Sequence, residues 1–357
     1  MLNPFIFVKM ETTICRDLVV GRLRGDSMDA NRLFLGYETA FWIWRKAGPQ
    51  AFLALTPTRV RSLAGGAPTV AKIEMFESEH PDLSLETIDV LVQYGDQRKV
   101  PHTKNHVRSL SFPDRSFYRL DDGVYVASPE LCLLQLASKL SEPQALKLAL
   151  EMCGGYAIDV HDEEMGFCKR PPLTSASKLD AYAKRLYKQG GGARALHPLR
   201  YVADNSASPR ETALYMLLCL PPRFGGYGLA LPEMNKRIEL SPREQLVLGN
   251  RYFECDLYWA EKRVAVEYDS AQYHTAQEKQ ERDAIRRNLL EHHGVHVITA
   301  TRQQVSDEGQ FDKLARQIAR AVGKRLRAPK QEYVAERSAL RKTVFDWDVL
   351  PPADDMD

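Results

Sequence analysis

Val264-Ala265-Val266-Glu267-Tyr268-Asp269 is an apolar run that ends in two carboxylates one residue apart. A third acid, Asp256, lies upstream, beyond the short charged turn Glu261-Lys262-Arg263. If the two runs are strands joined as a hairpin, period-two alternation puts Glu267 and Asp269 on one face and the apolar residues on the other. We therefore expect the acids to converge at the ends of two adjacent strands.

The segment after Asp269 extends this pattern. A strongly charged stretch, residues 276–293, has helical character, and Gly294 is a typical helix stop. A second apolar run, residues 295–300, follows directly. The expected order of elements is hairpin, helix, strand.

Carboxylates at the ends of adjacent strands form an all-oxygen pocket of the kind that holds Mg²⁺ beside a phosphate. A different reading is open, because an exposed antiparallel hairpin shows the same alternation with its polar face turned to water. The residues around the hairpin help to decide between a metal-binding pocket and a solvent-exposed polar face.

The stretch from Ser208 to Val305 resembles the small PD-(D/E)XK endonuclease domains related to very-short-patch-repair (Vsr) nucleases. Their pattern is a helix bearing Glu, a strand with Asp, a strand with Glu-x-Asp, a nearby His, and a helix with Asp and Arg before a Gly-led strand. The matching residues here are Glu211, Asp256, Glu267, Asp269, His274, Asp283 and Arg287. The resemblance implies a restriction-endonuclease-like domain, with a central mixed sheet flanked by helices.

The chemistry that this resemblance implies is metal-assisted phosphodiester hydrolysis. Asp256 and Glu267 would ligate Mg²⁺ or Mn²⁺, and the cation would stabilise charge on the phosphate and lower the pKa of a bound water. His274 would act as general base or general acid, since its ordinary pKa lies near neutrality. Asp269 and Glu211 complete the expected catalytic set.

The expected helix also carries candidates for nucleic-acid contact. Asp283 and Arg287 are four residues apart and share a helix face, so that Arg287 would grip a phosphate while Asp283 orients it or the His. Arg286 is the neighbouring candidate. The alternative for Asp283 and Arg287 is an ordinary surface ion pair.

Glu211 has a second explanation in local helix chemistry. In Ser208-Pro209-Arg210-Glu211, the Ser is a predicted N-cap, the Pro occupies the first helical position, and the Glu reaches back from the third. The same pattern recurs at Ser241-Pro242-Arg243-Glu244. A capping box explains Glu211 without any catalytic role.

The chain of 357 residues exceeds one average domain, so we expect two domains and a tail. The polar stretch at residues 204–208 suggests a boundary there. The expected parts are a mixed α/β domain over residues 1–205, the nuclease-like domain over 206–328, and a charged, mobile tail over 329–357. The formal net charge is only +2, so any face that binds nucleic acid must be local.

The six cysteines form no CxxC pair and no metal-finger spacing, which argues against a zinc site and a disulfide framework. No apolar stretch approaches the length of a membrane span, and the N-terminal Phe5-Ile6-Phe7-Val8 run is too short for a signal sequence. A cytoplasmic protein without a membrane partner is expected.

The first two hundred residues predict a mixed α/β structure. They contain a short aromatic helix candidate at 37–44, strand-like runs at 88–92 and 123–127, and apolar helices at 128–140 and 143–153. The run Val126-Ala127-Ser128-Pro129-Glu130 and the Leu-rich helix after it resemble the C-terminal region of AbiEi-type antitoxins. That resemblance implies DNA binding or regulation, with a toxin or another defence-system protein as partner.

Two classes of function follow. The first is a metal-dependent DNA endonuclease or nickase, active in phage defence or DNA repair. The second is a catalytically inactive DNA-binding or antitoxin-like regulator that retains the nuclease scaffold. RNA is a third possible substrate, since a site for a phosphate and a metal ion does not by itself distinguish the sugar. The overall fold class expected is α/β or α+β.

Overall fold

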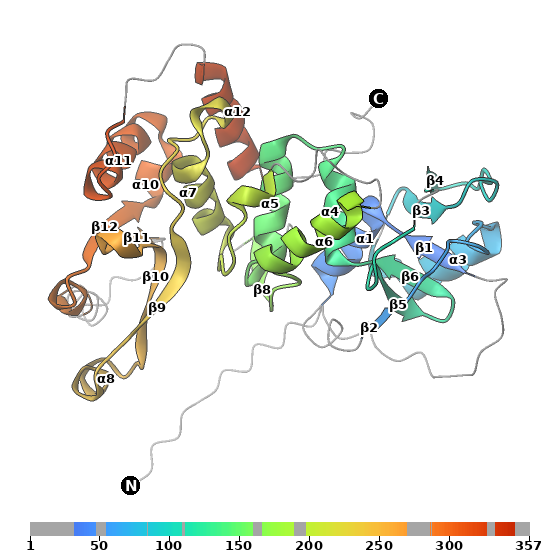
Figure 1. Cartoon of the computed structure of the whole chain (residues 1–357), viewed down its shortest axis with the longest axis horizontal. Helices are drawn as coiled ribbons and strands as arrows, with labels where there is room; N and C mark the ends of the chain where they lie inside the picture. The colour runs from blue at the N-terminus through green and yellow to red at the C-terminus, as the bar shows by residue number, and fades with distance from the viewer. Residues whose placement is uncertain are drawn as a thin grey trace, which may run out of the picture. The chain divides into compact units, whose positions relative to one another are not determined.

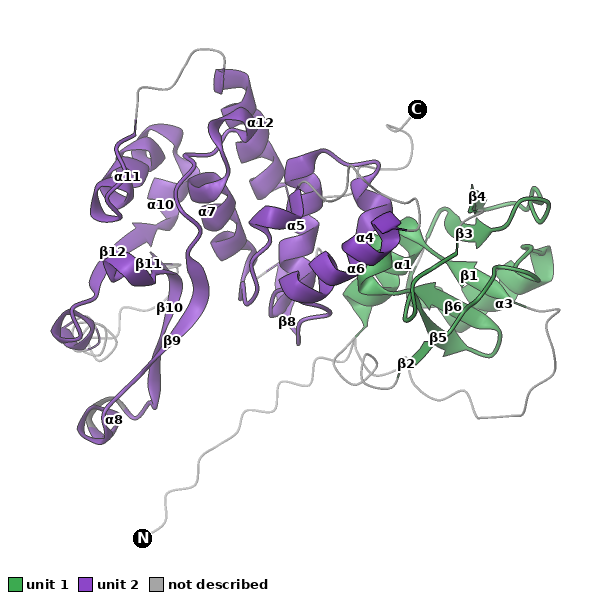
Figure 2. Ribbon diagram, in the orientation of Figure 1, with its two compact units in different colours: residues 1–132 green, residues 133–357 purple. Residues whose placement is uncertain are grey.

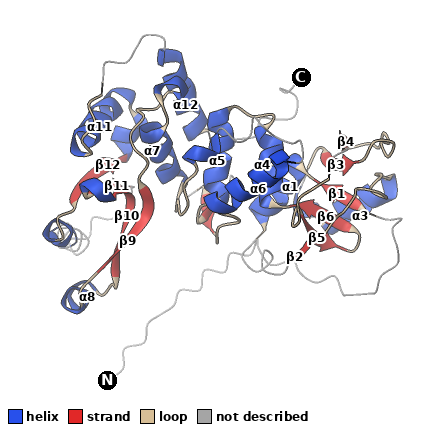
Figure 3. Ribbon diagram, viewed as in Figure 1, coloured by secondary structure: helices blue, strands red, loops and turns tan. Residues whose placement is uncertain are grey.

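The structure is a computed structural model, and it describes residues 32–47, 55–83, 85–108, 111–159, 166–188, 198–269, 286, 288–326 and 333–346 (Figure 1). Its contacts divide the chain into two compact units, Met1–Cys132 and Leu133–Asp357 (Figure 2). Helices and mixed sheets occur in both, which confirms the expected α+β class (Figure 3).

The first unit is built on a six-stranded sheet in the order β2-β5-β6-β1-β3-β4. β1 is parallel to β6 and β3 is parallel to β4, while the other neighbours are antiparallel. The strands are β1 (Leu33–Leu35), β2 (Thr56–Thr58), β3 (Ile88–Val92), β4 (Thr103–Val107), β5 (Phe117–Asp121) and β6 (Val124–Ala127). The strands predicted at residues 88–92 and 123–127 are confirmed.

Among the described residues of this unit, helices α1 (Tyr37–Lys46) and α3 (Val70–Glu79) accompany the sheet. The α1 helix buries Phe41, Ile43 and Trp44, and the indole nitrogen of Trp44 donates a hydrogen bond of 2.7 Å to the carbonyl of Ala127. The predicted aromatic helix is therefore confirmed. A short 3₁₀ helix, η1 (Pro81–Leu83), follows α3.

The second unit begins with helical structure. α4 (Pro129–Ala137) runs across the division between the units, and α5 (Glu142–Met152) starts with a capping box between Ser141 and Gln144. Both correspond to the predicted apolar helices. The hairpin strands β7 (Tyr156–Ile158) and β8 (Phe167–Lys169) follow, then α6 (Ala176–Lys188) and the 3₁₀ helix η3 (Pro198–Tyr201).

A four-stranded sheet in the order β12-β11-β10-β9 is the centre of the second unit. β9, β10 and β11 form an antiparallel meander, and β12 is parallel to β11. The strands are β9 (Glu233–Glu239), β10 (Tyr252–Trp259), β11 (Val264–Asp269) and β12 (His296–Thr301). The predicted hairpin is confirmed, and the strand predicted after Gly294 is β12.

The other described elements of this part of the chain are helices (Figure 3). They are α7 (Pro209–Cys219), α8 (Pro242–Leu248), α10 (Arg302–Ser306), α11 (Glu308–Ala321) and α12 (Val334–Phe345), with 3₁₀ turns at η4 (Pro222–Phe224) and η5 (Ala260–Lys262). Between β11 and β12, residue 286 and residues 288–292 are helical. The order of elements is helix, meander, helical segment and parallel strand.

Two apolar clusters bury the two faces of the sheet. The larger contains Leu257, Trp259, Val264 and Val266 together with apolar side chains of α7, α11 and α12. The smaller comprises Leu240, Phe253, Cys255, Ala265, Leu290 and Val295. The meander therefore lies between α7, α11 and α12 on one side and the helical segment at 288–292 on the other.

The tail expected to be mobile contains a packed helix. Leu340 and Val344 of α12 are 1% and 5% exposed, and they are part of the larger cluster. The Arg341 guanidinium donates to the carbonyls of Val305 and Ser306 at 2.9 and 2.5 Å. The expectation was wrong for residues 334–345, because apolar residues four apart give this charged segment a narrow buried face.

The contacts divide the chain earlier than the boundary expected near residue 205. Leu146 and Leu150 of α5 pack in the same apolar cluster as α7. The amide of Gly155 donates to the carbonyl of Ser206 at 2.7 Å, and the hydroxyls of Tyr156 and Thr212 lie 2.8 Å apart. Hydrogen bonds thus join the segments before and after the polar stretch at 204–208, so this stretch does not link two separate domains.

Candidate functional site

The hairpin register places Glu267 and Asp269 as alternation predicts. Leu257 pairs with Val266 and Trp259 with Val264, and all four side chains pack in the larger cluster. Ala265 packs in the smaller cluster, so Glu267 and Asp269 follow it on the same face of β11. Glu267 is partly buried, whereas Asp269 is exposed at the end of the strand.

Asp256 lies at the point in β10 where the buried residues switch from one face of the sheet to the other. Cys255 and Leu257 are two residues apart, yet they pack in different clusters on opposite faces of the sheet. Across the β9–β10 ladder, Cys255 pairs with Lys236 and Leu257 with Met234, and between these pairs Asn235 has φ +48°. This left-handed residue breaks the regular alternation opposite Asp256.

The position of Asp256 brings its carboxylate near groups from both faces. Its Oδ2 accepts a hydrogen bond of 2.7 Å from the amide of Tyr268 on β11. Burial raises the pKa of Asp256, while the Tyr268 amide and the charge of Arg286 act in the opposite direction. The charge of Asp256 also acts on Glu211 of α7.

Glu211 is a buried acid with a full set of hydrogen bonds. It is 8% exposed, and its carboxylate accepts from the Asn235 amide nitrogen at 2.6 Å, the Ala207 amide at 2.9 Å and the Ser208 hydroxyl at 2.8 Å. Burial and the charge of Asp256 raise its pKa to about 7, against the effect of these bonds. The raised pKa distinguishes Glu211 from an ordinary exposed cap.

The helix-capping role predicted for this segment is also present. The Ser208 side chain accepts from the Glu211 amide at 3.2 Å, as an N-cap does. The Glu211 carboxylate reaches back to the amide of Ala207, one residue before the position that a capping box uses. At α8, by contrast, Ser241 and Glu244 form the complete capping box.

Glu267 is engaged by an arginine. Both of its carboxylate oxygens accept from the Arg286 guanidinium, at 2.7 Å from Nη1 and 2.8 Å from Nη2. Nη2 also donates to the carbonyl of Glu254 at 2.6 Å. In this structure Arg286 forms a bidentate ion pair with Glu267, an expected metal ligand, and its contact with nucleic acid stays a prediction.

We refer to Glu211, Asp256 and Glu267 as the acid cluster. The charges of Glu211 and Asp256 interact, the charge of Arg286 acts on Asp256, and Arg286 holds Glu267. Among the described residues, one group of three metal-ligating side chains has all its donor atoms within 4.8 Å, and it is Glu79, His80 and Asp121 in the first unit. The carboxylate oxygens of the acid cluster do not all lie within this distance of one another.

Three expected site residues, His274, Asp283 and Arg287, lie outside the described residues. Sequence reasoning also overlooked Asn235, which donates to Glu211 and to the Asn205 carbonyl at 2.7 Å. A signal was available, because Asn adopts the left-handed conformation more readily than most residues and here interrupts a strand.

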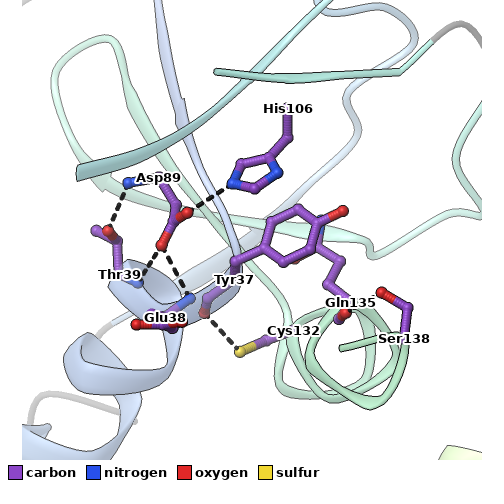
Figure 4. Close-up of polar contacts among 8 residues, drawn as sticks. All are labelled: Tyr37, Glu38, Thr39, Asp89, His106, Cys132, Gln135 and Ser138. Carbon is purple, nitrogen blue, oxygen red and sulfur yellow. Dashed lines mark hydrogen bonds and ion pairs between the residues drawn. The ribbon is translucent and has the colours of Figure 1, made fainter. Parts of the chain in front are cut away.

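A second buried polar cluster lies in the first unit (Figure 4). The Asp89 carboxylate accepts from the amides of Glu38 and Thr39 at 3.2 and 3.4 Å and lies 2.5 Å from Nε2 of His106. The imidazole stacks on Tyr37, with ring centroids 3.7 Å apart. Since α1 begins after a glycine, Asp89 supplies from β3 the capping carboxylate that its own N-cap lacks.

Within the described part of the chain, none of the helices combines the length and the apolarity needed to cross a membrane. Comparisons of the chain with models of protein families, with curated proteins and with solved structures gave no match.

Proposed function

We propose that this chain is a metal-dependent nuclease that hydrolyses phosphodiester bonds of DNA, as an endonuclease or a nickase, at the acid cluster. The observation that carries the proposal is the approach of Glu211, from helix α7, to Asp256, at the face change of β10. Burial and the charge of Asp256 raise the pKa of Glu211, and burial raises the pKa of Asp256. Buried carboxylates with perturbed pKa values are concentrated at reactive sites. Glu267 adds a third carboxylate from the adjacent strand.

The donor set suits a hard divalent cation such as Mg²⁺ or Mn²⁺. All three side chains offer carboxylate oxygens, and the repulsion between Glu211 and Asp256 is of the kind that a cation relieves. Asp256 and Glu267 would hold the ion, with Glu211 beside them. When bound, it would stabilise charge on the scissile phosphate and lower the pKa of a water molecule.

The protein's own groups would fix the geometry of the reaction. The Tyr268 amide orients Asp256, and Asn235 orients Glu211. In hydrolysis, the oxygen of water forms a bond to phosphorus while a phosphorus–oxygen ester bond breaks, one proton leaves the water and one reaches the departing oxygen. With a pKa of about 7, Glu211 is able to hold or release a proton near neutral pH. His274 as acid or base stays a prediction.

One observation favours the second class of function, a regulator that retains the nuclease scaffold but does not cleave DNA. Both oxygens of Glu267 are paired with Arg286, so an expected metal ligand already has a cationic partner. An inactive scaffold would keep such a pair as a structural link. Phage defence or DNA repair as the setting, and a toxin as partner, follow from the family resemblances alone.

The test is incubation of the purified protein with supercoiled plasmid in Mg²⁺ or Mn²⁺. We expect nicking or linearisation by the parent chain and its loss, by about 100-fold or more, in Asp256→Asn and Glu267→Ala. The matched control is Glu239→Gln, which removes an exposed carboxylate from β9 of the same sheet.

The outcomes separate the two classes of function. Activity that EDTA and both cluster variants abolish, but that Glu239→Gln retains, supports the nuclease. Retention of DNA by all four proteins with no cleavage supports the regulator. Preferential cleavage of an RNA of the same sequence would show that the substrate is RNA, while the proposed phosphodiester hydrolysis would be unchanged.

A further inference from the structure

The Arg286 guanidinium bonds both carboxylate oxygens of Glu267, the oxygens that would ligate a cation. It forms two parallel charge-assisted bonds to the carboxylate and a third to the Glu254 carbonyl. Its charge also acts on Asp256, the other expected ligand. One arginine thus neutralises the part of the acid cluster that a divalent ion would neutralise.

Arg286 and a divalent cation cannot both bind the two carboxylate oxygens of Glu267 at the same time. An ion at ligand distance, about 2.0 to 2.6 Å from carboxylate oxygen, would lie close to a guanidinium bonded to the same two oxygens. The like charges would repel each other in a partly desolvated site, where screening is weak. Binding of the cation through Glu267 therefore requires Arg286 to move.

Arg286 is the more exposed member of its ion pair with Glu267, which favours such a movement. Its side chain is 34% exposed, against 18% for Glu267. A guanidinium binds phosphate with the same fork geometry that it uses for carboxylate, so a phosphate at the site offers an equivalent partner. The backbone phosphate of a nucleic acid is such a group, and it would arrive at the place where the proposed reaction occurs.

We propose that Arg286 is an exchangeable counter-ion of Glu267. Before substrate arrives, it competes with the divalent cation for this carboxylate, and a nucleic-acid phosphate draws it away and opens Glu267 to the metal. The inference rests on the proposed nuclease function. It predicts that metal and nucleic acid bind cooperatively, since each favours the arrangement in which Arg286 has left Glu267.

The experiment is a titration of the full chain with Mn²⁺, followed by calorimetry, for the parent and for Arg286→Gln and Arg286→Lys. We expect Arg286→Gln to bind Mn²⁺ about fivefold or more tightly than the parent, the lower end of typical coupling. Arg286→Lys, which keeps the charge but loses the bidentate fork, should lie between them. The matched control is Arg237→Gln, which removes an exposed arginine paired with Glu254 on the same sheet and should leave the affinity unchanged.

A second titration adds a DNA duplex with phosphorothioate linkages, which slow cleavage. The duplex should tighten Mn²⁺ binding by the parent about fivefold or more and have a smaller effect on Arg286→Gln. Circular dichroism and thermal melting show whether each variant is folded. If Arg286→Gln fails to fold, the comparison of the parent with Arg286→Lys, with and without duplex, decides the question.

The results distinguish this inference from the proposed function. If the parent binds Mn²⁺ and cleaves plasmid but the folded Arg286 variants bind the ion equally or more weakly, Arg286 positions Glu267 and the competition is refuted while the nuclease stands. If neither the parent nor any variant binds Mn²⁺ or cleaves DNA, the nuclease proposal fails and the competition fails with it.

Discussion

Glu211 combines two properties in one side chain. It belongs to the N-terminal turn of α7, where its backbone amide bonds to Ser208, and its carboxylate is buried beside Asp256. A carboxylate in the first turn of a helix is favoured by the helix dipole, but burial and a neighbouring acid favour its protonated form. In this structure the second effect prevails, and the pKa of Glu211 rises to about 7.

The stability of the second unit should therefore depend on pH through Glu211. The pKa rises from 4.5, the ordinary value, to about 7 in the fold, so stability from the protonated form is fully present below about pH 4.5 and is lost as the pH rises through 7. In EDTA, the free energy of unfolding from urea titrations should fall between pH 5 and pH 8, by at most on the order of 3 kcal/mol from this group. Glu211→Gln should show a smaller fall.

The control for this measurement is Glu239→Gln, since Glu239 is exposed on β9. Its pH profile should follow that of the parent. Equal pH profiles for the parent and Glu211→Gln would contradict the prediction, because the Glu211 carboxyl would then not titrate in this range within the fold.

At the level of elements, α12 shows how a charged segment becomes part of a core. Half of its residues are polar, but Leu340 and Val344 are four residues apart and both are buried. Lys147 of α5 donates to the backbone carbonyls of Thr343 and Asp346, near the end of α12. The helix therefore joins parts of the second unit that are distant in sequence.

Truncation of the buried leucine tests this role of α12. Leu340→Ala should lower the free energy of unfolding by about 2 to 5 kcal/mol, since it removes buried methyl groups and leaves a cavity. Val334→Ala is the matched control on the same helix, because Val334 is 56% exposed, and it should change stability by less than about 0.5 kcal/mol. Equal effects in urea denaturation would show that α12 does not pack as described.

At the scale of the whole molecule, the division of the chain follows packing and not sequence composition. The polar turn residues at 204–208 suggest a linker, yet hydrogen bonds and the Leu146 and Leu150 side chains join α5 to α7. The second unit therefore includes structure on both sides of that turn.

Two fragments test this division. A fragment of residues 138–357 should unfold cooperatively, whereas one of residues 206–357 should unfold at a lower urea concentration, because it lacks Leu146, Leu150 and the Tyr156 hydroxyl beside Thr212. Far-UV circular dichroism during urea titration gives both midpoints. Identical midpoints would mean that the segment before residue 206 adds nothing to the stability of the sheet and its helices.

The sequence by itself determined the local elements of this protein. The strand alternation in Val264–Asp269, the capping residues before α5, α7 and α8, and the apolar stripes of the helices depend on neighbours a few residues away, so they are readable from the chain. The hairpin and the face that carries Glu267 were predicted on that basis and are confirmed.

Only the tertiary structure decided which groups meet. The face change at Asp256 depends on the left-handed Asn235 across the ladder, and the partner of Glu267 is an arginine 19 residues further along, on a helical segment. The contact of Lys147 with Thr343 spans 196 residues. Alternation and capping carry no information on such pairs, because burial, charge and reach select them only after the sheet and its helices have packed.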